Sequence, residues 1–196
     1  MARHDARVWV NQPSRALNKM SGLSMNKEKE RVHLMKVDNN PPKEVVIPKE
    51  QAVFWMDERG RWCNRHGPFE HQKIIAFFNR SIGKDEGGYY VCQEREGLRE
   101  KVYFRYHVTP IVAVDVLEGE PDRLVLNTGK IVSLSAEGLV IQDDHLYLRQ
   151  GGECIKISER VLLKYADRLK YAEGTYSFRA GEIWLRVPEF TLRSET

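Results

Sequence analysis

The chain has 196 residues, of which 41% are hydrophobic and 30% are charged, a balance typical of a soluble globular protein. Its 31 Lys and Arg against 28 Asp and Glu leave a net charge of +3, too small a surplus to predict binding to nucleic acid or to a membrane. The apolar runs fall far short of the roughly 20 residues that a membrane-spanning helix requires. Three widely spaced cysteines, Cys63, Cys92 and Cys154, favour a reducing compartment, so we expect a cytoplasmic protein.

Residues 1–48 are expected to form a flexible leader and linker. The first two dozen residues show no apolar periodicity and lack the apolar core of a signal peptide. Pro41 and Pro42 then exclude a helix and favour an extended linker. Met25 is an alternative start of translation. We therefore expect ordered structure to begin near residue 49.

A first small unit of helix and strands is predicted over residues 49–117. After two turns and a short aromatic strand, an amphipathic helix is expected over 69–82, because Ile74, Phe78 and Ile82 recur at intervals of four residues. The segments YYVC and KVYFRYHV, which follow the helix, have the composition of strands.

A second unit is predicted over residues 118–190, with a short tail at 191–196. A hairpin is expected around Asn127-Thr128-Gly129, and another through Ala180-Gly181. Between them Ser158 is a suitable N-cap for a helix over 158–172.

The two units repeat one order of elements, in which two strands, a helix and two more strands follow one another. Four pairs of similar residues are each separated by 86 positions, namely Asp57 and Asp143, Ile75 and Val161, Gly88 and Gly174, and Tyr90 and Tyr176. We therefore predict a duplication and an α+β fold that is mostly antiparallel β, with one principal helix in each unit.

Several stretches, taken in order, resemble the bacterial domain-of-unknown-function family numbered 1285. They cover about residues 50–190 and comprise the Asp57-x-x-Gly60-x-Trp62 segment, a helix ending in FFNR, the strand GGYYV, EKV at 100–102, TPIVAVDV at 109–116 and the terminal GEIWLRVPE. The resemblance implies two related domains, the second similar to a pleckstrin-homology-like fold, and no established enzymatic activity. It also implies a small, nucleotide-like ligand at the domain interface and a role in signalling. The chain departs from the family pattern in a longer QEREGLRE loop and in having His107-Val108-Thr109 where an acidic pair is expected.

The candidate ligand site combines cations with aromatic rings. Lys101, Tyr103 and Arg105 are expected to share one strand face by the two-residue period. Two cations around an aromatic ring can hold an anion and stack a base. With Arg99 and His107 nearby, the sequence predicts a site for a small anionic ligand near the junction of the units. The alternative is a solvated face whose cations pair with Glu94, Glu96 and Glu100.

A metal site is considered because Cys63, His66, His71 and Cys92 are the only cluster of suitable residue types. They lack the paired spacing of zinc motifs, so we expect no metal and no cofactor.

Enzymatic activity is left open by the sequence. Phosphate-loop, dinucleotide-binding and metalloprotease motifs are absent, and no catalytic residue is assigned. A nucleophile at Cys63 or Cys154 would need His66 or His145 as its base. We therefore expect a regulatory binding protein, with a small hydrolase or transferase in the same cleft as the alternative.

Overall fold

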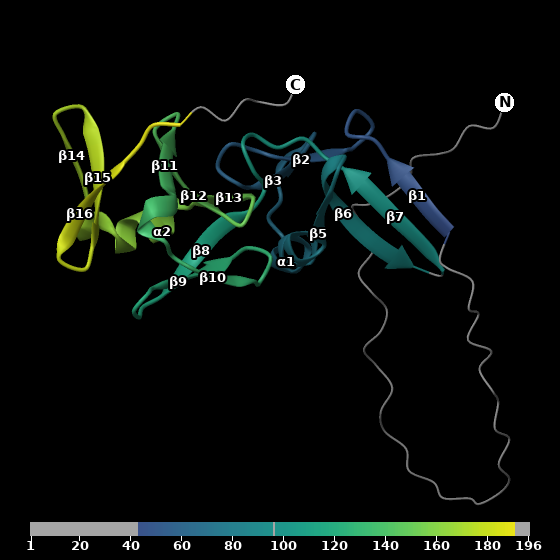
Figure 1. Cartoon of the computed structure of the whole chain (residues 1–196). Coiled ribbons are helices and arrows are strands. Elements are labelled where there is room, and N and C mark those ends of the chain that lie inside the picture. The colour runs from purple at the N-terminus through teal and green to yellow at the C-terminus, as the bar shows by residue number, and fades with distance from the viewer. Residues whose placement is uncertain (1–42, 96, 191–196) are drawn as a thin grey trace, which may run out of the picture. The chain divides into compact units, whose positions relative to one another are not determined.

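Strands dominate the computed structural model, which describes residues 43–95 and 97–190 (Figure 1). These residues form four separate sheets and two α-helices, and most neighbouring strands are antiparallel. The predicted α+β class with mostly antiparallel strands is thereby confirmed. The expected flexible leader before residue 43 and the tail at 191–196 lie outside the described residues. No described helix is long and apolar enough to cross a membrane.

A three-stranded meander contains β2 (Phe54–Met56), β3 (Trp62–Asn64) and β4 (Gly67–Pro68). The turn between β2 and β3 is closed by Asp57, whose Oδ1 accepts hydrogen bonds from the backbone N–H groups of Arg59 and Arg61 at 3.0 and 2.8 Å. This local side-chain bonding is what makes Asp a turn residue.

Helix α1 (Gln72–Arg80) is shorter than the predicted helix over 69–82. Phe78 is buried as expected, but Ile74 remains 40% exposed. Ile82 lies outside the helix, because the chain has already entered β5 (Ile82–Asp85). The three residues of the predicted stripe therefore do not share one buried helix face.

The second sheet has the order β1-β7-β6-β5, with β1 at Lys43–Ile47, β6 at Gly88–Arg95 and β7 at Leu98–Tyr103. The expectation that structure begins near residue 49 is wrong, because β1 pairs in parallel with β7 from Lys43↔Leu98 to Ile47↔Val102. Strand β7 ends at Tyr103, two residues before Arg105.

The third sheet has six strands in the order β10-β9-β8-β13-β12-β11. The bounds are β8 Val112–Leu117, β9 Arg123–Leu126, β10 Ile131–Ser133, β11 Leu139–Gln142, β12 His145–Gln150 and β13 Glu153–Ile157, with a short 3-10 helix at Ala136–Gly138. The predicted hairpin around residues 127–129 is confirmed as β9-β10. Strand β8 lies before the predicted boundary at residue 117, but it pairs with β9 and β13 and so belongs to this sheet.

Helix α2 (Glu159–Lys164) is also shorter than predicted. Its N-cap is Ser158, as expected, and the Ser158 side chain accepts a hydrogen bond from the backbone of Val161 at 3.4 Å. A 3-10 helix (Ala166–Arg168) follows, and residues 169–172 of the predicted helix form β14, the first strand of the sheet β14-β15-β16. These strands span Leu169–Ala172, Thr175–Ala180 and Ile183–Val187, so the hairpin predicted at residues 180–181 is confirmed.

An order of elements recurs along the chain. A meander (β2-β3-β4), a helix (α1) and three strands (β5-β6-β7) are followed, after β8-β10, by a meander (β11-β12-β13), a helix (α2) and three strands (β14-β15-β16). Gly88, the first residue of β6, and Gly174, in the turn between β14 and β15, both have positive φ values, 105° and 73°.

One hydrophobic cluster extends through the described residues on both sides of position 117. Its first part is aromatic: Phe54, Trp62 and Phe104 pack with ring centroids 4.8–6.0 Å apart. Leu124 and Leu148, which are fully buried, belong to its later part. The predicted boundary at 117 therefore does not separate two hydrophobic cores.

Candidate functional site

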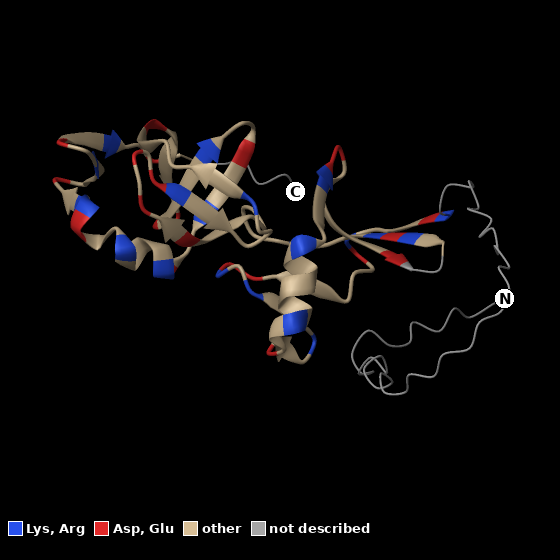
Figure 2. Cartoon of the chain, turned by 90° about the horizontal axis from the view of Figure 1, so that it is seen from below, with Lys and Arg blue, Asp and Glu red and all other residues tan. Residues whose placement is uncertain are grey.

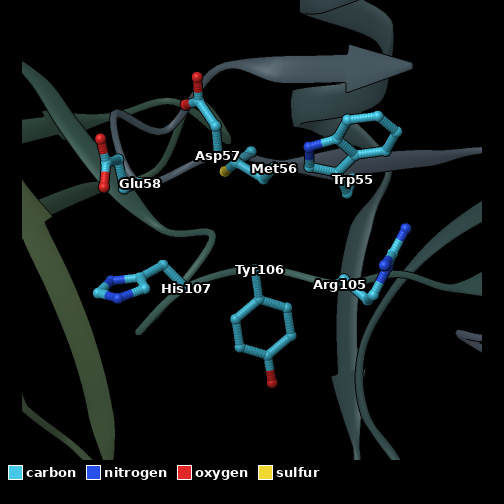
Figure 3. A pocket seen from close by; sticks show the side chains of 7 residues that line it. All are labelled: Trp55, Met56, Asp57, Glu58, Arg105, Tyr106 and His107. Carbon is cyan, nitrogen blue, oxygen red and sulfur yellow. The ribbon is translucent and has the colours of Figure 1, made fainter. Parts of the chain in front are cut away.

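An open hollow of about 520 Å³ lies beside the end of β2 and the segment that follows β7 (Figure 3). Its lining residues are Trp55, Met56, Asp57, Glu58, Arg105, Tyr106 and His107. The two segments are joined by a parallel bridge between Trp55 and Arg105, and the Met56 N–H donates to the Arg105 carbonyl at 2.8 Å. Backbone pairing thus fixes the spacing of the side chains on both segments.

Arg105 and Trp55 lie at one end of the hollow (Figure 3). The Arg105 guanidinium carbon is 5.6 Å from the centroid of the indole ring, a cation–π distance. Arg105 is exposed, and no carboxylate of residues 43–95 and 97–190 forms an ion pair with it. This end therefore offers a cation beside an accessible aromatic face.

Glu58 and His107 lie at the opposite end, and both are exposed (Figure 3). The neighbouring carboxylate of Asp57 is committed to Arg61, whose Nε and terminal nitrogen each lie 2.8 Å from Asp57 Oδ2. Burial alone would raise the pKa of Asp57, but the hydrogen bonds and charge of Arg61 outweigh it and lower that pKa. Glu58 and His107 are thus the polar side chains at this end that can turn to a ligand.

The structure places Lys101 and Tyr103 on one face of β7, as predicted, but their polar groups are already engaged. Lys101 Nζ forms a close ion pair with Asp85, and the Tyr103 hydroxyl donates to the same carboxylate at 2.9 Å. The hydrogen bond to Asp85 raises the pKa of Lys101 and in turn lowers the pKa of Asp85. Figure 2 shows both charge signs along these strands. The Arg99 Nε donates to Cys92 Sγ at 3.4 Å.

Arg105 and His107 are not on that strand face. Because β7 ends at Tyr103 and the Arg105 carbonyl bonds to Met56, the side chain of Arg105 belongs to the hollow. The predicted group of site residues is therefore split between two places. The partner of Lys101 is Asp85 on β5, a residue that no local sequence pattern indicated.

Trp55 and Glu58 were missed by the sequence analysis. The alternation in β2 could have indicated Trp55, because its neighbours Phe54 and Met56 are buried and Trp55 itself points outward. Nothing local indicated Glu58, whose importance depends on Arg105 and His107 lying some fifty residues later.

The described residues contain no group of three or more His, Cys, Asp or Glu arranged to hold a metal. Cys63 Sγ contacts Asp57 Oδ2 at 3.8 Å and the Arg61 carbonyl at 3.6 Å, and burial, followed by the Asp57 charge, raises the pKa of this thiol. Burial also raises the pKa of Cys154 to about 11. Both shifts disfavour the thiolate that a nucleophilic cysteine requires.

Known proteins were compared with the chain by sequence and by structure, and only the comparison of structures found a similar fold. No family model and no curated protein matches the chain. A solved DUF1285 family protein from Silicibacter pomeroyi DSS-3 is similar, with a TM-score of 0.50 and 14% identity over 74% of this chain and 83% of that one. A second, from Shewanella baltica OS155, has a TM-score of 0.44 and 14% identity over 61% of this chain and 94% of that one.

The described residues form a mostly β, α+β fold, and the first of these likenesses shows that the Silicibacter pomeroyi protein shares it. The particular resemblance is to the DUF1285 family, which the ordered motifs of the sequence predicted and the structural comparison confirms.

Proposed function

We propose that the protein binds a small anionic ligand in the hollow between Trp55 and His107. The observation that carries this proposal is the Arg105 guanidinium, 5.6 Å from the Trp55 ring and without a carboxylate partner among the described residues. A guanidinium binds phosphate or carboxylate through paired hydrogen bonds, and an indole face stacks on a planar ring. Both groups act at the same end of the hollow.

The opposite end favours a ligand that also has a polar edge. The Glu58 carboxylate can accept hydrogen bonds from an amine, and the His107 ring can donate or accept one. A volume of about 520 Å³ is within the size range of ligand pockets. An anionic group joined to a planar, amine-bearing ring is the chemistry of a nucleotide, which the family resemblance also implies.

The proposal also includes the duplication, the type of the second unit and the biological role of the protein. The repeated order of elements supports a duplication, with a second unit of the pleckstrin-homology-like type that the resemblance implies. We further propose a ligand-dependent regulatory or signalling role, which the family resemblance implies, and a cytoplasmic location, which the three widely spaced cysteines favour. Lys101, Tyr103 and Arg99 would take part only if an anion displaced Asp85 from Lys101.

The test is a thermal-shift screen over nucleotides and small carboxylates or phosphates. A ligand present at a hundred times its Kd should add about 2.7 kcal/mol of stability. Any ligand found is then titrated against Trp55→Leu and Arg105→Ala, with Arg99→Ala as the matched control. Binding that is weakened by both hollow variants and not by the control supports the proposal, whereas unchanged affinity in both would refute it.

A second candidate is a small hydrolase or transferase that uses the same hollow. It is favoured by one observation, the placement of Glu58 and His107 at one end, where a carboxylate and an imidazole could transfer protons. The test is turnover of a bound nucleotide or ester. An enzyme would be identified if the wild type turns the ligand over and both Glu58→Gln and His107→Ala bind the ligand without turning it over.

A further inference from the structure

Lys156 on β13 is a buried cation, only 9% exposed. Its ammonium donates a close hydrogen bond to the main-chain carbonyl of Glu58 and lies 5.8 Å from the centroid of the Tyr147 ring. No ion pair joins it to a carboxylate of the described residues. Since a buried ammonium is costly unless it is paired or well hydrogen-bonded, the Glu58 carbonyl is the partner that offsets its desolvation.

The turn that receives this bond is docked on the parallel pair β8–β13. Lys156 is the register partner of Val112 in that pair. At Gly60, on the same turn, an added Cβ would lie 2.8 Å from Val112 Cγ2, so turn and strand are in direct contact. Neighbouring residues of the six-stranded sheet thus hold the turn at two points, Glu58 and Gly60.

This turn also forms the acidic end of the hollow. Glu58 lines the hollow with its side chain while its carbonyl bonds to Lys156. Asp57 is fixed on the same turn by Arg59 and Arg61. A displacement of the Glu58 backbone would therefore move its carboxylate relative to His107 and Arg105.

We propose that Lys156 is a positioning residue for the hollow. Its ammonium fixes the Glu58 backbone, so that the six-stranded sheet determines the position of the Glu58 carboxylate at the acidic end of the hollow. The proposal rests on the proposed function insofar as the hollow is a binding site. Lys156 lies outside the hollow, yet through the Glu58 backbone it would determine where the Glu58 carboxylate meets the polar edge of a ligand.

The charge of Lys156 can be removed without a mutation. Burial lowers the pKa of Lys156 below the ordinary value of 10.5. The ionisable groups that surround it are Asp57 and Glu58 on the turn, Glu159 at the start of α2 and Tyr147 on β12. Burial also raises the pKa of Tyr147 to about 12, so Lys156 loses its proton before Tyr147 does.

The experiment follows the carbonyl carbon of Glu58 by ¹³C-detected NMR between pH 8 and pH 11, without any ligand. In the wild-type protein this resonance should titrate together with Lys156 Nζ, at a midpoint below 10.5. Lys156→Met should abolish the titration and shift the resonances of residues 57–61. Lys170→Met, which removes an exposed lysine of β14, should leave both unchanged.

A Glu58 carbonyl that does not titrate with Lys156 in the wild-type protein overturns the proposal, and this measurement decides even if Lys156→Met fails to fold. AMP is then titrated into the wild type and both variants. Failure of AMP to bind the wild type counts against the nucleotide class of the proposed function alone. AMP affinity that is unchanged in a folded Lys156→Met variant overturns the effect of Lys156 on the hollow.

Discussion

The indole nitrogen of Trp62 donates a hydrogen bond to Asn79 Oδ1 at 2.8 Å, joining β3 to the last turn of α1. The amide nitrogen of Asn127, from the turn between β9 and β10, approaches the same oxygen at 3.5 Å and donates to the Pro110 carbonyl at 2.9 Å. Trp62 is only 2% exposed, so its N–H depends on this partner. Asn79 therefore links the first meander to the six-stranded sheet.

Asn79→Ala should lower the free energy of unfolding by about 1–3 kcal/mol, because it leaves the buried N–H of Trp62 without its acceptor. The control is Arg80→Ala, which alters the adjacent exposed residue and should change the free energy by less than about 0.5 kcal/mol. Urea unfolding of the two variants and the wild type provides the comparison. Equal stability of the two variants would contradict this role of Asn79.

Local sequence patterns predicted those elements whose partners are near in the chain. The turn at Asp57 and the hairpin at residues 127–129 were found because Asp, Asn and Gly act on their own neighbours. Strand β1 was missed because its partner, β7, lies some fifty residues later. A period within one segment contains no information about such pairing.

The candidate site was predicted only in part, because its contacts also join segments that are distant in the chain. Arg105 and His107 were named, but the pairing of Arg105 with Trp55 is a contact between distant backbone segments. The two-residue period also assumed that β7 continues through Arg105, whereas it ends at Tyr103. Asp85 reaches Lys101 only through the alignment of β5, β6 and β7.

Asp122→Ala is expected to be strongly destabilising. The Asp122 side chain is 9% exposed, and its Oδ2 lies 2.5 Å from a guanidinium nitrogen of Arg168. Its other oxygen accepts the Gly119 N–H at 3.0 Å. Loss of one partner of a buried ion pair typically costs about 3–5 kcal/mol.

The matched control for Asp122 is Asp167→Ala. Asp167 also pairs with an arginine, Arg179, at 3.0 Å, but the Asp167 side chain is 72% exposed. An exposed pair contributes about 0–1 kcal/mol, so this variant should unfold almost like the wild type. Calorimetric melting curves that rank the two variants in the opposite order would show that burial does not determine the strength of these pairs.

Lys101 and Arg105 should differ in their effect on binding. Arg105→Ala removes a cation without a carboxylate partner and should weaken an anionic ligand by roughly tenfold or more. Lys101→Ala removes a cation that is already paired with Asp85 and should change the affinity little. Isothermal titration with a ligand from the thermal-shift screen measures both. A larger loss in Lys101→Ala would move the site from the hollow to the face of β7.

The Asp57–Arg61 pair should make stability depend on pH in acid. The folded state lowers the pKa of Asp57 below 3.8, so the unfolded chain binds the proton more readily. The stabilisation is therefore complete above about pH 3.8 and is lost as the pH falls through the folded value. Asp57→Asn should cost about 1 kcal/mol at pH 6 and progressively less below pH 3.8.

Urea unfolding at pH 6 and at pH 3 measures this difference. Arg61→Gln should retain part of the pH dependence, because the backbone N–H at position 61 still donates to Asp57. A gap between wild type and Asp57→Asn that widens in acid would contradict the assignment.

Gly60→Ala should destabilise the protein for two separable reasons. Gly60 has a φ of 75°, a left-handed conformation that costs an L-residue about 1 kcal/mol or more. Its new Cβ would also meet Val112 Cγ2 at 2.8 Å. Gly174→Ala is a matched control, since its φ is 73° and nothing lies within 4 Å of the added Cβ. Gly60→Ala should therefore lose more stability than Gly174→Ala.

A double-mutant cycle with Val112→Ala tests the contact with Val112. Once the cost of Val112→Ala alone is subtracted, the extra loss of stability in Gly60→Ala should be smaller in the double variant. If the two glycine variants lose equal stability, the turn at Gly60 does not pack against β8. The contact between this turn and the six-stranded sheet, on which the proposed role of Lys156 depends, would then be wrong.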